Sequence, residues 1–307
     1  MEKRRFYLFI FFVCLSVNLS FVFAAEDSKK ENKSKAYYEK QVKGGYSSYK
    51  KNDSKLPELE LSVILSGDCK TCDTNSFLKR LKKYFSKVNL TTVDLSEAEE
   101  IVKQSGIKSL PIYFIAKELA VKEDLEKISS FIVEKDFGFV FKPQFSGMTF
   151  LLDRQLKKGK IDLFISLFEE DSPQIISNLK ELNPQVHFLA IKRGNEFIAR
   201  SGKKELEEIN KAVCIEKYYP DEYLDYLSCR VNNIKSSWWD ECIKDVDYKT
   251  IKQCAMGEEL KSLLGENLNL VMELNVFSQA TVLLENRELF HVLPQTTADG
   301  LEHLLSK

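Results

Sequence analysis

The stretch Ser66-Gly67-Asp68-Cys69-Lys70-Thr71-Cys72 follows an apolar strand, Leu59 to Leu65, and precedes a helical pattern of apolar residues that begins near Phe77. Alternating apolar residues predict the strand, and apolar residues three and four apart predict the helix. Two thiols with two residues between them close a small disulfide, and a helix N-terminus stabilises a thiolate. We therefore expect a redox-active center with Cys69 as the nucleophile and Cys72 as the resolving thiol.

The residues after this turn continue an α/β pattern. Residues 88–95 (VNLTTVDL) predict a strand, 97–104 a helix that Gly106 ends, and 112–115 a further strand. Pro111 stands where that strand opens, and a cis Leu110–Pro111 peptide bond would reconcile proline with this position. Residues 122–134 are predicted to close the unit as a helix, followed by an ordered connector with Phe137-Gly-Phe-Val-Phe141, Pro143 and Gly147.

The order of strand, Cys-x-x-Cys, helix, strand, helix and Gly-Ile-x-x-Leu-Pro resembles the thioredoxin-like superfamily. The resemblance implies that the loop of Pro111 lies against Cys69 and Cys72 and that its backbone pairs with a bound peptide. One departure concerns the acid often buried behind the cysteine pair in thioredoxins. The strand positions that would carry it, such as Val63, are apolar, so the residue that handles the proton is open.

Two cysteines also suit a metal ion or a structural disulfide. Zinc needs further ligands, and residues 56–150 contain no other Cys and no His, so we expect no zinc site. Copper(I) prefers soft thiolate ligands, and copper binding by Cys69 and Cys72 stays a weaker alternative. We expect no metal and no diffusible cofactor.

The second half of the chain repeats the pattern without the cysteines. Residues 161–167 predict a strand, 173–182 a helix that Pro173 begins, and 185–191 a strand followed by a turn. Phe168 to Gln174 occupies the place of the Cys-x-x-Cys, and Ala280 stands before the strand 282–284 where the family has proline. We expect a second thioredoxin-like domain whose active site is degenerate.

A helical stretch, residues 203–274, interrupts this second unit and carries four cysteines, Cys214, Cys229, Cys242 and Cys254. It resembles the insertion in thioredoxin-like domains of the DsbA type and of lysosomal thiol reductases. The cysteines are spaced too widely for a redox turn and suit bridges between helices. A sequential pairing (214–229 and 242–254) and a nested pairing (214–254 and 229–242) both remain open, and a second relay dithiol is a weaker alternative.

The N-terminus predicts export. Positive residues at Met1 to Arg5 precede an apolar segment, and Val22-Phe23-Ala24 suits a signal peptide cleaved after Ala24. An uncleaved membrane anchor is the alternative, and it is the only membrane contact that we expect. Cleavage after Ala24 would remove Cys14. The other six cysteines are an even number, which favours disulfides and an oxidising compartment such as the periplasm. The chain has 45 basic and 46 acidic residues, so it has no excess of positive charge that would attract nucleic acid.

Together these patterns predict an α/β chain of two tandem thioredoxin-like domains, the second with an α-helical insertion. The expected divisions are a signal peptide (1–24), a charged linker (25–56), a domain with Cys-x-x-Cys (57–142), a connector (143–159) and a DsbA-like domain (160–307). The predicted function is that of an exported thiol–disulfide oxidoreductase with protein substrates and a redox partner protein. A non-catalytic binding or chaperone-like module is the alternative. The direction of electron flow and the oligomeric state stay open.

Overall fold

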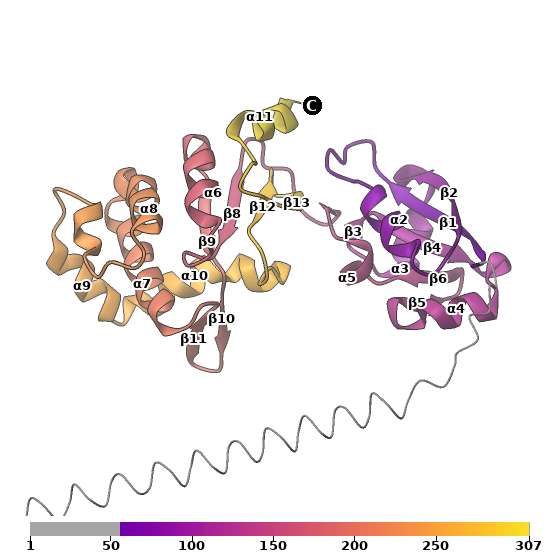
Figure 1. Ribbon diagram of the computed structural model, residues 1–307, viewed down its shortest axis with the longest axis horizontal. Coiled ribbons are helices and arrows are strands. Elements are labelled where there is room, and N and C mark those ends of the chain that lie inside the picture. Colours follow the sequence, from indigo (N-terminus) through magenta and orange to yellow (C-terminus); the bar gives the residue numbers. More distant parts are fainter. Residues whose placement is uncertain (1–55, 307) are drawn as a thin grey trace, which may run out of the picture. The chain divides into compact units, whose positions relative to one another are not determined.

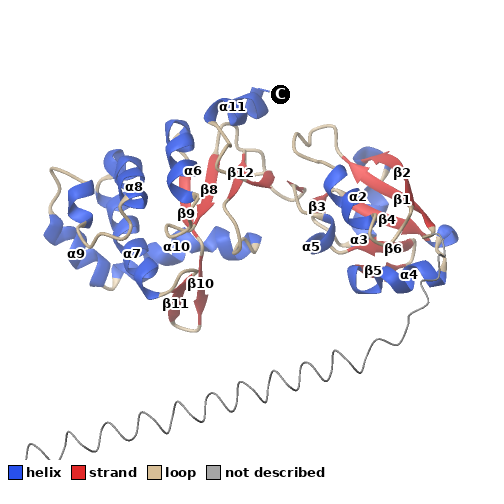
Figure 2. Cartoon of the chain, in the orientation of Figure 1, coloured by secondary structure: helices blue, strands red, loops and turns tan. Residues whose placement is uncertain are grey.

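A computed structural model describes residues 56–306, and these residues form the predicted mixed α/β fold (Figure 1; Figure 2). The expected signal peptide and nearly all of the expected linker lie outside the described residues. None of the helices in the described range is both long and apolar enough to span a bilayer. The strands belong to two larger sheets and one small hairpin.

The N-terminal sheet has the order β2-β1-β4-β6-β5. Strand β1 pairs in parallel with β2, and the other pairs in this sheet are antiparallel. Its strands are β1 (Glu58–Leu65), β2 (Lys87–Asp94), β4 (Ile112–Ala116), β5 (Ile132–Lys135) and β6 (Gly138–Phe141). The helices in this half are α2 (Asn75–Leu81), α3 (Glu99–Ser105), α4 (Lys122–Ile128) and α5 (Pro143–Ser146).

Alternation along β1 and β4 separates two apolar layers. Val63 and Tyr113 join one cluster with Phe77 of α2 and Ile128 of α4. Their neighbours in sequence, such as Ile64, point to the other cluster, where α3 packs. Successive side chains of a strand point to opposite faces, so a short alternating sequence supports helices on both sides of this sheet.

The predicted helix at 122–134 is too long. Helix α4 stops at Ile128, and Ile132–Lys135 instead forms strand β5 against β6. Ile128 and Ile132 have helical spacing and are both buried, which explains the prediction. Phe137 to Phe141, predicted as connector, supplies β6, which pairs with β4 in the interior of the sheet.

The C-terminal sheet has the order β3-β7-β13-β12-β8-β9. Only β8 and β9 pair in parallel. Its edge strand β3 (Ser109–Leu110) comes directly before Pro111 and pairs with β7 (Phe150–Leu151), which lies in the predicted connector. The remaining strands are β8 (Ile161–Ile165), β9 (Gln185–Phe188), β12 (Thr281–Leu284) and β13 (Glu288–His291), with the separate hairpin β10 (Ala190–Arg193) and β11 (Glu196–Ala199). The division into two thioredoxin-like domains stays a prediction.

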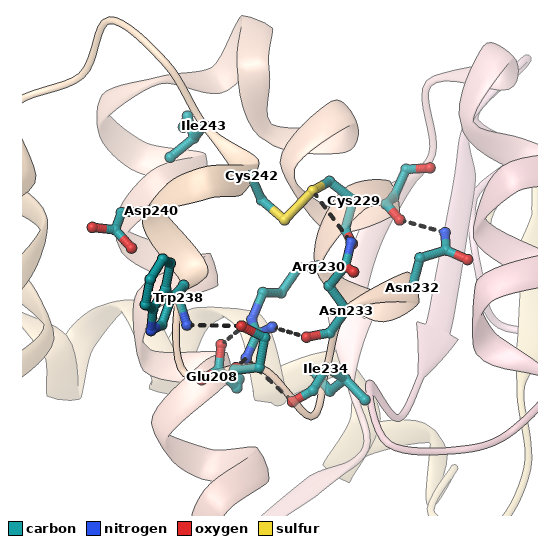
Figure 3. The surroundings of a disulfide bond; sticks show 12 residues. Glu208, Cys229, Arg230, Asn232, Asn233, Ile234, Trp238, Asp240, Cys242 and Ile243 are labelled. Carbon is teal, nitrogen blue, oxygen red and sulfur yellow. Dashed lines mark hydrogen bonds and ion pairs between the residues drawn. A yellow bond between two sulfur atoms is a disulfide. The ribbon is translucent and has the colours of Figure 1, made fainter.

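Residues 203–274 contain four α-helices (Figure 1). The helices of this half are α6 (Ser172–Leu179), α7 (Lys203–Tyr218), α8 (Tyr223–Asn232), α9 (Tyr248–Met256), α10 (Glu259–Leu274) and α11 (Ala298–Ser306). The cysteines pair in the nested order, Cys214 with Cys254 and Cys229 with Cys242. The first bridge joins α7 to α9, and the second joins α8 to the turn after Trp239 (Figure 3). All four sulfurs are therefore consumed in bridges between helical segments.

Glu216 on α7 makes the stability of this region depend on pH. Burial raises the pKa of Glu216 to about 7, and the positive charge of His187 offsets only part of this. A raised carboxyl pKa favours the folded state below pH 4.5, and this stability is lost as the pH rises through 7. We expect Glu216→Gln to remove a pH-dependent loss of roughly 2–3 kcal/mol in the free energy of unfolding between pH 5 and pH 8.

Urea denaturation at both pH values measures this difference. Glu207→Gln on the same helix is the matched control because Glu207 is exposed, and it should keep the wild-type pH dependence. If the free energy of unfolding depends on pH equally in the wild type and in Glu216→Gln, burial does not raise the pKa of Glu216, and the prediction is wrong.

Candidate active site

The two sequence motifs are brought together by the pairing of β1 with β4. Ile64 near the end of β1 lies opposite Ile112 at the start of β4. In an antiparallel pair, the end of one strand adjoins the beginning of the other. The Cys-x-x-Cys loop that follows β1 therefore leaves the sheet beside Pro111. The Leu110–Pro111 peptide bond is cis, as predicted.

Cys69 and Cys72 form a disulfide, with Cα atoms 5.6 Å apart. Both residues are partly exposed, and both pack at the edge of the apolar cluster that contains Ile64 and Leu110. A partly exposed sulfur is open to attack by a thiol from outside. The structure therefore places the disulfide where a second molecule can reach it.

The position of the helix differs from the prediction. Helix α2 begins at Asn75, so Cys69 lies in an irregular loop and not at a helix N-terminus. Asp73 explains the late start, because its carboxylate accepts hydrogen bonds from the Asn75 N–H (2.9 Å) and the Ser76 hydroxyl (3.2 Å). The Asn75 N–H holds the pKa of Asp73 below its usual value. The helix dipole consequently gives Cys69 little of the expected stabilisation.

Thr149 links Cys72 to the proline loop. Its Oγ1 lies 3.5 Å from Cys72 Sγ and donates a hydrogen bond of 3.0 Å to the Leu110 carbonyl. The Thr149 N–H bonds to the same carbonyl. This residue lies just before β7, in the predicted connector, and no motif in the sequence pointed to it.

Glu288 at the start of β13 supplies a buried acid next to the cysteine pair. Its side chain accepts hydrogen bonds from the Lys70 N–H (2.8 Å), the Thr71 N–H (3.2 Å) and the Thr71 hydroxyl. Glu288 is only 3% exposed, and its Oε2 lies 3.7 Å from Cys69 Sγ. A disulfide sulfur carries no proton, so this is a sulfur–oxygen contact that becomes a possible S–H hydrogen bond after reduction.

The side chain of Lys70 points to other partners. Its Nζ lies 3.4 Å from Glu285 Oε2 and 3.3 Å from the Leu305 carbonyl, which lies in α11. Glu285 belongs to the tight turn between β12 and β13 and has a positive φ of 52°. An ammonium group next to a cysteine favours its thiolate, but this one is already paired with another carboxylate.

A cleft of about 1120 Å³ opens beside this loop. Thr71, Asp73 and Pro111 line it from the side of the two motifs, and Thr281 and His291 line it from the C-terminal sheet. Its size suits a segment of peptide chain next to Pro111.

The corresponding place in the C-terminal half has no thiols. Buried Glu205 accepts hydrogen bonds there from the Ser166 hydroxyl (2.5 Å) and the Leu167 N–H (2.8 Å). These hydrogen bonds connect the end of β8 to α7, so the role of Glu205 is to stabilise the fold.

Comparison with solved structures finds thioredoxin-like oxidoreductases. The oxidoreductase NmDsbA1 from N. meningitidis is 11% identical, covers 50% of this chain and 86% of its own, and gives a TM-score of 0.37. A thioredoxin-like oxidoreductase from Silicibacter pomeroyi DSS-3 is 9% identical, covers 48% of this chain and 87% of its own, and gives 0.34. The oxidoreductase NmDsbA3 from Neisseria meningitidis is 14% identical, covers 52% and 92%, and gives 0.32.

No family model matches the chain, and no curated protein matches its sequence.

Proposed function

We propose that this chain is an exported thiol–disulfide oxidoreductase that exchanges disulfides with protein substrates through Cys69 and Cys72. One observation carries the proposal: the Cys69–Cys72 disulfide is partly exposed, next to Pro111 and to a cleft of peptide size. A disulfide with a purely structural role has no need of either neighbour.

The exchange runs in two balanced steps. In the reducing direction, the Cys69 thiolate attacks a substrate disulfide, a Cys69–substrate bond forms, and one substrate thiolate leaves. The Cys72 thiolate then attacks the Cys69 sulfur and releases the second substrate thiolate. The substrate gains two electrons, Cys69 and Cys72 become a disulfide, and a redox partner protein must reduce them again. Oxidation of a substrate dithiol follows the same steps in reverse.

The other disulfides support a site of action outside the cytoplasm, in the periplasm of a bacterial cell. Cys214–Cys254 and Cys229–Cys242 are bridges between helical segments, and such bridges persist in oxidising compartments. In this proposal, residues 57–142 carry the chemistry, and residues 160–307, with their degenerate site, help to bind the substrate. Pro111 holds the bound peptide through its backbone.

Equilibration with graded glutathione buffers tests the proposal. After alkylation, tryptic peptides separate the two thiols, because cleavage after Lys70 leaves Cys69 in residues 56–70 and Cys72 in residues 71–79. We expect the two cysteines to titrate together as a dithiol–disulfide pair, with a potential between about −120 and −270 mV. The four cysteines of residues 203–274 should stay oxidised over the same range. A pair that never titrates would support the binding-module alternative.

A further inference from the structure

We propose that Glu288 is the positioning residue that keeps Cys69 protonated in the reduced protein. This inference deepens the proposed function and rests on it. Glu288 lies in the sequence 219 residues from Cys69, and its carboxylate contacts both Cys69 Sγ and the backbone N–H groups next to it. A segment near the C-terminus thus controls when the nucleophile becomes reactive.

The first argument concerns hydrogen-bond donors. Backbone N–H groups that follow a reactive cysteine are the ones that commonly stabilise its thiolate. Here the N–H groups of Lys70 and Thr71 donate to the two carboxylate oxygens of Glu288. The Thr71 hydroxyl donates to Glu288 as well. These donors are therefore not free to stabilise a negative charge on Cys69.

The second argument concerns charge. A carboxylate 3.7 Å from a sulfur opposes the formation of a second negative charge, and burial strengthens this repulsion. Asp68 on the same loop adds a further, exposed negative charge. Lys70 is the opposing cation, but its ammonium group pairs with Glu285 and the Leu305 carbonyl.

The side chains that pack at the pair are apolar, and the Arg287 guanidinium, which donates to the Arg154 carbonyl, lies over the Phe150 ring of the same cluster, 5.7 Å from its centroid. The apolar cluster at the cysteines contains Ile64, Leu110 and Phe150, and the Thr149 hydroxyl lies 3.5 Å from Cys72 Sγ. Within residues 56–306, Glu288 forms no ion pair with a Lys, Arg or His side chain. No side-chain cation therefore neutralises the Glu288 carboxylate, and its charge acts on Cys69 Sγ.

The pH dependence of Cys69 alkylation tests this role without any need for turnover. The protein is reduced chemically, iodoacetamide is added at pH 6 to 11, and the peptide of residues 56–70 reports Cys69 alone. In the wild type, the half-maximal rate should lie above pH 8.5, the usual value for a free cysteine, by about one pH unit. A wild-type midpoint at or below pH 8.5 overturns the proposal with no variant required.

Glu288→Gln keeps the shape of the side chain and removes its charge. We expect the midpoint to fall by about one pH unit, the plateau at high pH to fall about threefold because a less basic thiolate is a weaker nucleophile, and the rate at pH 7 to rise about threefold. Glu288→Asp retains the charge and should restore a midpoint within about half a unit of the wild type. A midpoint of Glu288→Gln equal to that of the wild type contradicts the proposal.

Glu285→Gln is the matched control. Glu285 lies three residues away on the same hairpin and bonds to the same loop, but through the Lys70 side chain, with no contact to Cys69. Its midpoint should fall by clearly less than that of Glu288→Gln, because the change frees the Lys70 ammonium group but leaves in place the carboxylate that contacts Cys69 Sγ. Failure of the glutathione titration would reject the proposed function, whereas equal effects of the two Gln variants would reject only the special role of Glu288.

Discussion

Replacing Cys69 with serine should abolish the proposed disulfide exchange, and replacing Cys72 with serine should leave a protein that forms a lasting mixed disulfide with its substrate. Exchange requires a thiolate for attack and a second thiolate for release, and a serine hydroxyl supplies neither. We expect each variant to lose turnover on a model protein disulfide by on the order of a thousandfold or more. The Cys72→Ser adduct should persist on a non-reducing gel and disappear on addition of dithiothreitol.

A second pair of cysteines in the same chain provides the control. The double variant Cys229→Ser, Cys242→Ser removes a bridge that closes a short loop in residues 203–274, at a cost of about 3 kcal/mol in the free energy of unfolding. Its exchange rate should remain near that of the wild type at temperatures where it is folded. Loss of exchange in this variant, with full activity in Cys69→Ser, would move the chemistry to the second half of the chain.

Local sequence patterns were sufficient for most of the fold around Cys69. Strand β1 and its alternation, the helix that ends at Gly106, and the cis bond before Pro111 all follow from rules that act over fewer than about ten residues. The start of α2 was misplaced because Thr71, Asp73 and Thr74 are all acceptable residues near a helix start. Only the hydrogen bonds of Asp73 show which turn is the first one.

The strand β5 and the site residues Thr149 and Glu288 depend on pairing between distant segments. Ile132 satisfied a helical spacing, and only the neighbouring strand β6 decides that it belongs to a sheet. Glu288 begins a short strand, and its sole unusual feature in the sequence is a charge next to apolar residues. No rule of spacing connects it to a loop 219 residues earlier, so its contact with Cys69 requires the three-dimensional structure.

The pairing of the four cysteines in residues 203–274 was open for the same reason. Their spacing allows a sequential scheme as readily as a nested one. The nested scheme follows from the packing of α7 against α9, which brings Cys214 to Cys254. That packing depends on buried residues spread over the whole stretch, among them Ile209, Ile251 and Leu264.

Arg230 on α8 should be among the costliest single residues to remove from the fold. It is 1% exposed, and its guanidinium donates to Glu208 Oε2 (2.8 Å) and to the carbonyls of Asn233, Ile234 and Ser236 (Figure 3). Removing one partner of a buried ion pair leaves the other charge without compensation. We expect Arg230→Ala to lower the free energy of unfolding by about 3–5 kcal/mol in urea denaturation at pH 7.

The pH dependence distinguishes this charge effect from lost packing. Burial raises the pKa of Glu208, but hydrogen bonds from Arg230 and Lys211 outweigh it and hold the pKa below its usual value. In the wild type, this contribution is present above pH 4.5 and is lost as the pH falls through the lowered pKa. Without Arg230, Glu208 can take up a proton more easily. The loss in free energy of unfolding caused by Arg230→Ala should therefore become smaller as the pH is lowered from 7 to 4.

Lys180→Ala is the matched control for Arg230→Ala, because Lys180 pairs with Asp225 at 3.2 Å on the exposed surface. An exposed pair contributes less than about 1 kcal/mol, so this variant should unfold close to the wild type. A deficit of Arg230→Ala that stays constant with pH would assign its cost to the three carbonyls and to packing. In that case the bonds that shape residues 233–236, just before Cys242, would matter more to this bridge than the charge of Glu208.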